Sequence, residues 1–221
     1  MQIKYYGHAC FTLEHQGTLL IFDPFLNNNP LAPVKADAIK ADYILVTHGH
    51  HDHLGDTLEI AEKNNTTVIT SVEMAVAYEK PGINFHRMNL GGSFKFPFGR
   101  VKMTPALHGA GVAGGRACGF IVDFFGKIIY FAGDTGLFGD MKLIGELNSL
   151  DVAILPIGDN FTMGVEDAVV AAQFLQAKKV IPMHYNTWPL IQVDPKVFQA
   201  GVERTSNSQC IILEPGEEIE L

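Results

Sequence analysis

The sequence predicts an α/β protein with two β-sheets packed face to face and helices outside them. Strand-like segments dominate both ends of the chain, and no linker or low-complexity stretch separates its two halves. The glycine-containing stretch 108–116 lacks the strand-to-helix context and the spacing of a dinucleotide motif, which disfavours a doubly wound nucleotide-binding fold. A chain of 221 residues is long enough for one large domain and short for two. We therefore expect a single domain over residues 1–221.

The first half is predicted as a meander followed by alternating strands and helices. Its expected strands are short apolar runs bounded by turn residues, namely residues 3–6, 10–14, 18–22, 43–46 and 66–70. Gly17 lies in the turn between the second and third strands, where we expect a positive φ. A loop rich in proline and asparagine covers residues 24–33. Helices are expected at 56–64 and 71–80, and Pro81-Gly82 ends the second one.

The second half contains further apolar strands and one clear amphipathic helix. The expected strands are residues 101–106, 118–124, 127–131, 151–155, 179–182 and 210–213. Residues 165–177 are predicted as a helix because apolar side chains recur at helical spacing on one face. They are Val165, Ala168, Val169, Ala172 and Leu175. Glu166 and Asp167 lie in its first turn, where the helix dipole favours negative charge. We expect the apolar stripe to pack against a sheet.

Composition and charge limit the classes of function. A hydrophobic content of 47% with 18% charged residues is typical of a well-buried globular protein. Acidic residues outnumber basic ones, 24 to 16, and the net charge of −8 without a basic run makes a nucleic-acid partner improbable. No secretory signal or membrane-spanning apolar stretch is seen, so no membrane association is expected. We expect a small-molecule substrate, and the sequence makes no prediction of oligomeric state.

The three cysteines bear on the cellular compartment. Cys10, Cys118 and Cys210 are odd in number and widely separated. This pattern fits reduced thiols better than a disulfide framework or a thiolate zinc site. We interpret all three as small buried hydrophobic residues in a cytoplasmic protein.

A dense histidine cluster directly follows the apolar run 43–46. Four of the chain's nine histidines lie within residues 48–53, and Asp52 lies among them. Neutral imidazole and carboxylate are preferred ligands of zinc and neighbouring first-row metals. A polar surface loop or a purification tag is the alternative, but the cluster is internal and is interrupted by Gly49, Asp52 and Gly55. The cluster therefore predicts a metal site.

Four other metal-capable side chains follow apolar strands. They are Asp23, His108, Asp134 and His184. Each one alone is explained equally well as a hydrogen-bonded residue at a strand end. Four such placements in addition to the histidine cluster favour a set of ligands over coincidence.

Taken in order, these residues resemble the metallo-β-lactamase superfamily of hydrolases. The motif His48-x-His50-x-Asp52-His53 is the specific part, and the four strand-end residues follow the family order over nearly the whole chain. The segments Gly7-His8-Ala9-Cys10-Phe11 and Phe22-Asp23-Pro24-Phe25 resemble a narrower group, the small stand-alone metal-dependent hydrolases related to ascorbate-6-phosphate lactonase. The resemblance implies a four-layer αββα sandwich of two mixed β-sheets with outer helices, and a binuclear site between the sheet edges.

The resemblance also implies two divalent metal ions and a role for each ligand. The first ion would be held by His48, His50 and His108. The second would be held by Asp52, His53 and His184, with Asp134 bridging both ions. Asp23 is expected to orient ligand histidines from outside the ligand set. Zinc suits these ligands best, and manganese and iron tolerate the same set.

Two bridged ions would supply hydroxide at neutral pH for attack on a carbonyl carbon or on phosphorus. Asp52 is expected both to bind the second ion and to accept a hydrogen bond from the nucleophile. His8 either donates a proton to the leaving group or substrate oxygen, or has a structural role. His51 occupies a variable position of the motif, with solvent or a local hydrogen bond as its expected surroundings. His15 and His86 have no motif support and are interpreted as structural.

The leading hypothesis is a metal-dependent hydrolase of a small ester, lactone, thioester or phosphodiester. An RNA-directed phosphodiesterase of the same fold and a non-catalytic regulatory protein on this scaffold are the alternatives. Residues 27–33 and 109–115 are expected at the rim of the substrate pocket. Five further residues are either pocket candidates or ordinary turn and packing residues: Asp159, Asn160, Tyr185, Asn186 and Trp188.

Overall fold

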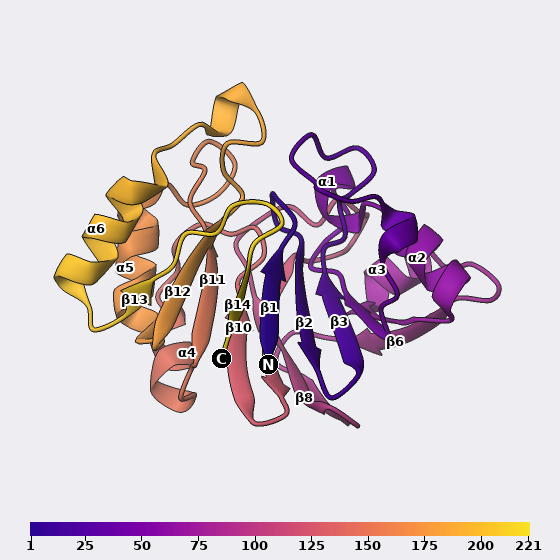
Figure 1. The fold of residues 1–221 in the computed structure, drawn as a ribbon. Helices are drawn as coiled ribbons and strands as arrows, with labels where there is room; N and C mark the ends of the chain where they lie inside the picture. Colours follow the sequence, from indigo (N-terminus) through magenta and orange to yellow (C-terminus); the bar gives the residue numbers. More distant parts are fainter. The chain divides into compact units, whose positions relative to one another are not determined.

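Two seven-stranded mixed β-sheets contain all the strands of this computed structural model, which describes residues 1–221 (Figure 1). The chain divides into two compact units, each built on one sheet. The first unit contains residues 1–92, 109–117 and 214–221, and the second contains 93–108 and 118–213. The prediction of two sheets with helices is confirmed. The two halves are not simply successive, however, because residues 109–117 and 214–221 return to the first unit. One domain over residues 1–221 stays a prediction.

The first sheet has the order β14-β1-β2-β3-β4-β5-β6. Its strands are β1 (Gln2–Tyr5), β2 (Phe11–His15), β3 (Thr18–Phe22), β4 (Tyr43–Leu45), β5 (Thr67–Ser71), β6 (Asn84–Met88) and β14 (Glu218–Glu220). Antiparallel pairing from β14 to β3 gives way to parallel pairing from β3 to β6. Because β3 and β4 are parallel neighbours, their carboxyl ends lie at the same edge of the sheet.

The turn between β2 and β3 has the backbone that the sequence predicts. Gly17 has φ 76°, and Gln16 before it also has a positive φ of 49°. His15 pairs with Thr18, so the loop has two residues, and positive φ at both fits the type I′ turn that matches the twist of a hairpin.

Helices of the first unit cover one face of its sheet. They are α1 (His51–Leu54), α2 (Thr57–Asn64) and α3 (Val72–Ala77), together with the 3₁₀ helix η1 (Ala36–Ala38). Ile60 of α2 and Met74 of α3 belong to a buried cluster with Ile21, Ile44 and Val68 of the sheet. Burial of each large aliphatic side chain contributes about 1.5–3 kcal/mol. This packing holds the strand ends that carry the histidine cluster.

The second sheet has the order β13-β12-β11-β10-β9-β8-β7. Its strands are β7 (Ser93–Phe96), β8 (Gly99–Pro105), β9 (Cys118–Phe124), β10 (Lys127–Phe131), β11 (Val152–Pro156), β12 (Lys179–Met183) and β13 (Gln209–Cys210). Strands β10 to β13 are parallel, and the pairings among β7 to β10 are antiparallel. Strands β8, β10 and β12 therefore run in the same direction and end at the same edge of this sheet.

The helices of the second unit pack beside β11 and β13 (Figure 1). They are α4 (Met141–Leu147), α5 (Val165–Leu175), α6 (Pro195–Thr205) and the 3₁₀ helix η2 (Pro189–Ile191). Ala168, Ala172 and Leu175 of the predicted stripe are fully buried, and Glu166 and Asp167 lie in the first turn of α5 as expected. No helix combines the length and the apolar character needed to cross a bilayer.

Several predicted boundaries are wrong. The helix expected to reach residue 177 ends at Leu175 because Gln176 takes a left-handed conformation with φ 50°. The helix expected to reach residue 80 ends at Ala77. The strand expected at 210–213 is β13, which covers only Gln209–Cys210. The sequence did not predict β6, β7, β14, α1, α4, α6 or the 3₁₀ helices η1 and η2.

Candidate metal centre

The seven predicted ligands are divided between the two units. His48, His50, Asp52 and His53 lie in the first unit and are called here the first ligand group. His108, Asp134 and His184 lie in the second unit and are called the second ligand group. The first group follows the carboxyl end of β4 alone, whereas the members of the second group follow β8, β10 and β12, which end at the same edge of their sheet.

Asp23 is the buried centre of the first group's hydrogen bonds. It follows β3, and its Oδ1 accepts the backbone N–H of Thr47 at 2.8 Å. Its Oδ2 accepts the Thr47 hydroxyl at 2.7 Å and lies 2.7 Å from Nδ1 of His53. A carboxylate only accepts hydrogen bonds, so Nδ1 of His53 carries the proton. In the neutral imidazole this leaves the lone pair on Nε2, the atom that a metal needs.

Thr47 sets the tautomer of His48 in the same way. Its hydroxyl has one proton, which it donates to Asp23, so it accepts a hydrogen bond from Nδ1 of His48 at 2.9 Å. The lone pair of a neutral His48 is therefore also on Nε2. That atom lies 2.9 Å from Nδ1 of His50, close to the separation of about 3.3 Å that two nitrogens of one tetrahedral zinc ion have. One buried carboxylate thus sets, directly or through Thr47, the tautomers of two ligand histidines.

The other end of the first group is the helical turn α1. Oδ2 of Asp52 lies 3.7 Å from Nε2 of His53 and 3.0 Å from Nε2 of His8. His8 and His53 are completely buried. His51 is the opposite case: its side chain is 81% exposed, and its Nδ1 lies 3.7 Å from Oδ1 of Asp52. The turn therefore directs two ligands inward and one extra histidine into solvent.

The glycine-rich loop 109–117 packs against the segment that carries His48 and His50. The backbone N–H of Gly49 donates to the carbonyl of Ala110 at 2.8 Å. A Cβ on Gly49 would lie 2.9 Å from Cγ1 of Val112, and a Cβ on Gly111 would lie 2.7 Å from the backbone nitrogen of His50. Residues 109–115 thus directly support the ligand backbone, in addition to any part they have in a pocket rim.

The proline- and asparagine-rich loop after Asp23 is fixed by hydrogen bonds. Oδ2 of Asp56 accepts the backbone N–H groups of Leu26 and Asn27, each at 2.8 Å. The backbone N–H of Asp56 donates to the carbonyl of Pro24 at 2.8 Å. Phe25 is thereby held with its ring edge-on to those of His8 and His51, at centroid distances of 5.8 Å and 5.9 Å.

The second ligand group is centred on Asp134. Its Oδ2 lies 3.2 Å from Nε2 of His184 and 3.5 Å from Nε2 of His108. Thr135 fixes the surrounding loops: its hydroxyl accepts the backbone N–H of Leu107 at 2.9 Å, and its carbonyl accepts that of Met163 at 2.9 Å. Asp134 and His184 are buried and His108 is partly exposed.

The donor atoms present suit a divalent metal ion. Buried imidazoles and carboxylates gather in each group, and the ligand atoms of His8, Asp52 and His53 all lie within 4.8 Å of one another. These are the nitrogen and oxygen ligands that zinc and its neighbours take. Cys10 is not among the residues whose ligand atoms gather there, and burial, with the nearby carboxylates of Asp23 and Asp56, raises the pKa of its thiol well above its ordinary value. The His/Asp cluster is therefore one that can bind metal.

The remaining sequence candidates have varied surroundings. Asp159 and Asn160 are exposed, and Tyr185 is buried. Oδ1 of Asn186 accepts the backbone N–H of Val193 at 2.8 Å, and Trp188 precedes the first turn of η2. The sequence did not predict that Thr47 and Asp56 support the site through hydrogen bonds. A signal for both was present, because they directly flank the motif between His48 and Gly55.

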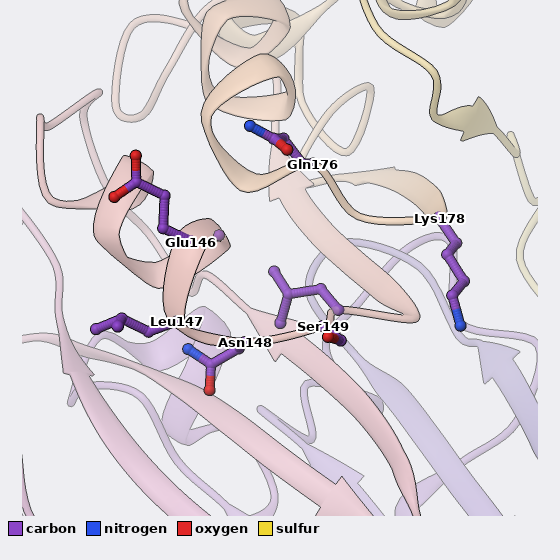
Figure 2. A pocket seen from close by; sticks show the side chains of 8 residues that line it. Glu146, Leu147, Asn148, Ser149, Gln176 and Lys178 are labelled. Atoms are coloured by element: carbon purple, nitrogen blue, oxygen red, sulfur yellow. The ribbon is translucent and has the colours of Figure 1, made fainter.

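A polar pocket in the second unit has none of the predicted ligands in its lining. It has a volume of about 320 Å³ and lies by the carboxyl ends of α4 and α5 (Figure 2). Glu146, Asn148, Ser149, Gln176 and Lys178 contribute its polar side chains. It contains no histidine, so it is not a candidate for the metal chemistry.

The sequence and the structure are similar to those of known metal-dependent proteins. The family model described as the beta-lactamase superfamily domain matches residues 18–185. A UPF0173 metal-dependent hydrolase of Natranaerobius thermophilus is 52% identical over 221 residues, covering 100% of both chains.

Solved structures are similar over the full length as well. Igni18, a novel metallo hydrolase from the hyperthermophilic archaeon Ignicoccus hospitalis, has a TM-score of 0.92 and 36% identity, covering 99% of this chain and 97% of its own. The metallo-beta-lactamase fold protein YhfI from Bacillus subtilis has a TM-score of 0.76 at 11% identity, covering 99% of this chain and 98% of its own. These similarities confirm the fold class that the sequence predicts.

Proposed function

Because the chain belongs to the metallo-β-lactamase superfamily and is a metal-dependent hydrolase, we propose that it uses two divalent ions, most simply zinc, to hydrolyse a small ester, lactone, thioester or phosphodiester. The ligand assignment is the one that the family resemblance implies. By that assignment His48, His50 and His108 would hold one ion, and Asp52, His53 and His184 would hold the other, with Asp134 as a ligand of both.

The observation that carries this proposal is the pairing of ligand atoms inside the first group. Nε2 of His48 faces Nδ1 of His50 at 2.9 Å, while Oδ2 of Asp52 lies 3.7 Å from Nε2 of His53. These two pairs of ligand atoms support two ions. The first group alone has four ligand-capable side chains, which exceeds the three protein ligands that a single catalytic zinc ion takes.

When bound, two such ions activate a water molecule at neutral pH and polarise the oxygen of a carbonyl or phosphoryl group. The side chains do the rest of the work. The Asp23–Thr47 pair keeps the Nε2 lone pairs of His48 and His53 available for coordination. Asp52 is placed to accept a hydrogen bond from the nucleophile, since its carboxylate is acceptor-only and still partly open to solvent.

A small-molecule substrate is part of the proposal, as is a cytoplasmic location. The net charge of −8 opposes binding to a polyanion such as RNA. None of the three buried cysteines forms a disulfide, which suits a reducing compartment.

Substitution of one ligand from each unit tests the proposal. Asp134→Asn and His53→Ala should each abolish hydrolysis while circular dichroism shows an intact fold. The matched control is Asp140→Asn, an exposed residue whose side chain makes no capping hydrogen bond to α4, and it should keep full activity.

Activity is measured against ester, lactone, thioester, phosphodiester and RNA substrates, with zinc and manganese compared and bound metal counted by mass spectrometry. We expect about two ions per chain, as in other two-metal hydrolases. Protein that holds no metal and does not rebind it would refute the proposal. Turnover of RNA alone would replace the small-molecule substrate by a nucleic acid.

A further inference from the structure

His8 has no role in the mechanism above, and it lies in a turn that several contacts hold in place. The turn joins β1 to β2, and the backbone N–H of Cys10 donates to the carbonyl of Gly7 at 3.1 Å. His8 has φ 60°, in the left-handed region that few residues other than glycine adopt. The hydroxyl of Tyr5 donates to the carbonyl of His8 at 3.3 Å. A Cβ on Gly7 would lie 2.9 Å from Cβ of Leu31, so the loop after Asp23 packs directly on this turn.

The turn between β1 and β2 directs the imidazole of His8 towards Asp52. Nε2 of His8 lies 3.0 Å from Oδ2 of Asp52, and the side chain of His8 has no exposed surface. The carboxylate only accepts hydrogen bonds, so Nε2 of His8 carries the proton and donates it. In this arrangement the Nε2 lone pair of His8 is not available to a metal ion.

We propose that His8 is a positioning residue that fixes the carboxylate of Asp52 for metal binding through this hydrogen bond. The proposal rests on the proposed function, in which Asp52 is a ligand. A carboxylate oxygen has more than one lone-pair direction. With His8 occupying one of them, Oδ2 keeps another for the gap of 3.7 Å to Nε2 of His53.

A second contact of this kind holds His53, which the proposed function assigns to the same ion as Asp52. There, a buried carboxylate, Asp23, fixes a ligand imidazole, His53, at 2.7 Å. Here a buried imidazole fixes a ligand carboxylate. His8 and His53 are also neighbours, with ring centroids 5.6 Å apart. Both ligands of the first unit to this ion are therefore held by a partner outside the ligand set, the arrangement that tunes metal affinity in other sites.

Two amide substitutions at His8 distinguish the effect of losing the hydrogen bond from the effect of disturbing the fold. His8→Gln places an amide N–H where Nε2 of the imidazole was. His8→Asn keeps an amide but is too short to reach Asp52, and asparagine tolerates the left-handed backbone at this position. His8→Phe, which keeps the ring shape without any donor, is the second variant without the hydrogen bond. His86→Phe, a substitution on the edge strand β6, is the control.

Zinc affinity is measured by competition with a chromogenic chelator on metal-stripped protein, together with the visible absorption of the cobalt-substituted protein. We expect His8→Asn and His8→Phe to weaken binding of one of the two ions by about 10–100-fold and to alter the cobalt spectrum. His8→Gln should restore most of the affinity, and His86→Phe should match the wild type. Thermal unfolding of the metal-free proteins identifies any variant that does not fold.

Three results overturn the positioning role. Wild-type affinity in both His8→Asn and His8→Phe would show that the hydrogen bond does not affect the metal. Loss of one ion in His8→Gln as well as in His8→Asn would make His8 a direct ligand. Unchanged affinity with lost turnover would make it a proton donor to the substrate. Failure of the wild-type protein to bind metal would instead refute the proposed function.

Discussion

Three residues of the candidate site have a left-handed backbone: His8, Asp23 and His184, with φ of 60°, 40° and 55°. Each follows a strand or lies in the turn after one, so the reversal of φ bends the chain sharply where the side chain is needed. Such conformations cost on the order of 1–3 kcal/mol each, and surrounding contacts must hold them. For His184 the contact is close packing, because a Cβ on Gly158 would lie 2.1 Å from its carbonyl oxygen. The site is thus fixed at the expense of local stability.

At the level of single residues, Asp23→Asn should weaken metal binding. The amide would bring a donor to a position where both carboxylate oxygens now receive hydrogen bonds from Thr47 and His53. We expect metal affinity to fall about 10–100-fold, by analogy with other outer-sphere partners. The free energy of unfolding should fall by about 1–3 kcal/mol, since a buried polar group loses its partner. Asparagine tolerates positive φ, so the backbone itself should be little affected.

Chelator competition and urea unfolding measure the two effects of Asp23→Asn. The matched control is Asp42→Asn in the same unit, where Oδ2 accepts one backbone N–H, from Leu19, without contact to a ligand. The control should lose some stability and keep wild-type metal affinity. Equal affinities in the two variants would contradict the orienting role of Asp23.

At the level of elements, the ligand segment 48–50 depends on the loop 109–117. This loop is distant in sequence but belongs to the same compact unit. It contacts the segment through glycines, because a Cβ on Gly111 would lie 2.6 Å from the carbonyl carbon of Gly49, and a Cβ on Gly49 would lie 2.9 Å from Cγ1 of Val112. The loop therefore fixes the backbone of His48 and His50, which are ligands of the first ion in the proposal.

Alanine substitution at two glycines of that loop separates close packing from backbone strain. Gly111 and Gly114 have nearly equal positive φ, 68° and 71°. A Cβ on Gly111 would lie 2.6 Å from the carbonyl carbon of Gly49, whereas nothing lies within 4 Å of one on Gly114. Gly114→Ala should therefore cost only the left-handed backbone, about 1–2 kcal/mol. Gly111→Ala should cost more, by about 1–3 kcal/mol of overpacking.

Thermal unfolding and metal affinity measure both variants of the loop. Gly111→Ala should also weaken metal binding because it displaces His50, while Gly114→Ala should leave the affinity unchanged. Identical losses in the two variants would show that the loop does not support the ligand segment.

Elements with strong local signals were predictable from the sequence. Three strands, 18–22, 118–124 and 127–131, have the predicted bounds because each is an apolar run between turn residues. The helix α6 was missed although Asp194 and Pro195 give a standard start signal, with Oδ1 of Asp194 accepting the N–H of Lys196 at 3.0 Å. The edge strands β7 and β14 carry many exposed residues, so no apolar run marks them.

The candidate site was predictable only in part. Ligand types and their order are visible in the sequence because they follow strands. The contacts of Asp56, Thr47 and the loop 109–117 depend on pairs that are distant in sequence, such as Asp56 with Leu26. Short-range patterns contain no information about such pairs.

At the scale of the whole molecule, the proposal that the protein binds two ions predicts that metal adds to its stability. The predicted ligands number four in the first unit and three in the second. The net charge is −8, and two divalent ions would halve it. Without metal, the buried carboxylate of Asp134 adds unfavourable charge to the interior.

Metal removal should therefore lower the melting temperature as well as abolish activity. An ion present at 100 times its Kd stabilises the native state by about 2.7 kcal/mol if it does not bind the unfolded chain. For a chain of this size that corresponds to a rise of about 5–10 °C on reloading. Calorimetry of stripped and zinc-reloaded protein, with metal content measured on the same samples, tests this. His48→Ala should show a smaller rise, since it lacks a ligand of one ion, and an equal melting temperature in stripped and fully loaded wild-type protein would contradict the coupling.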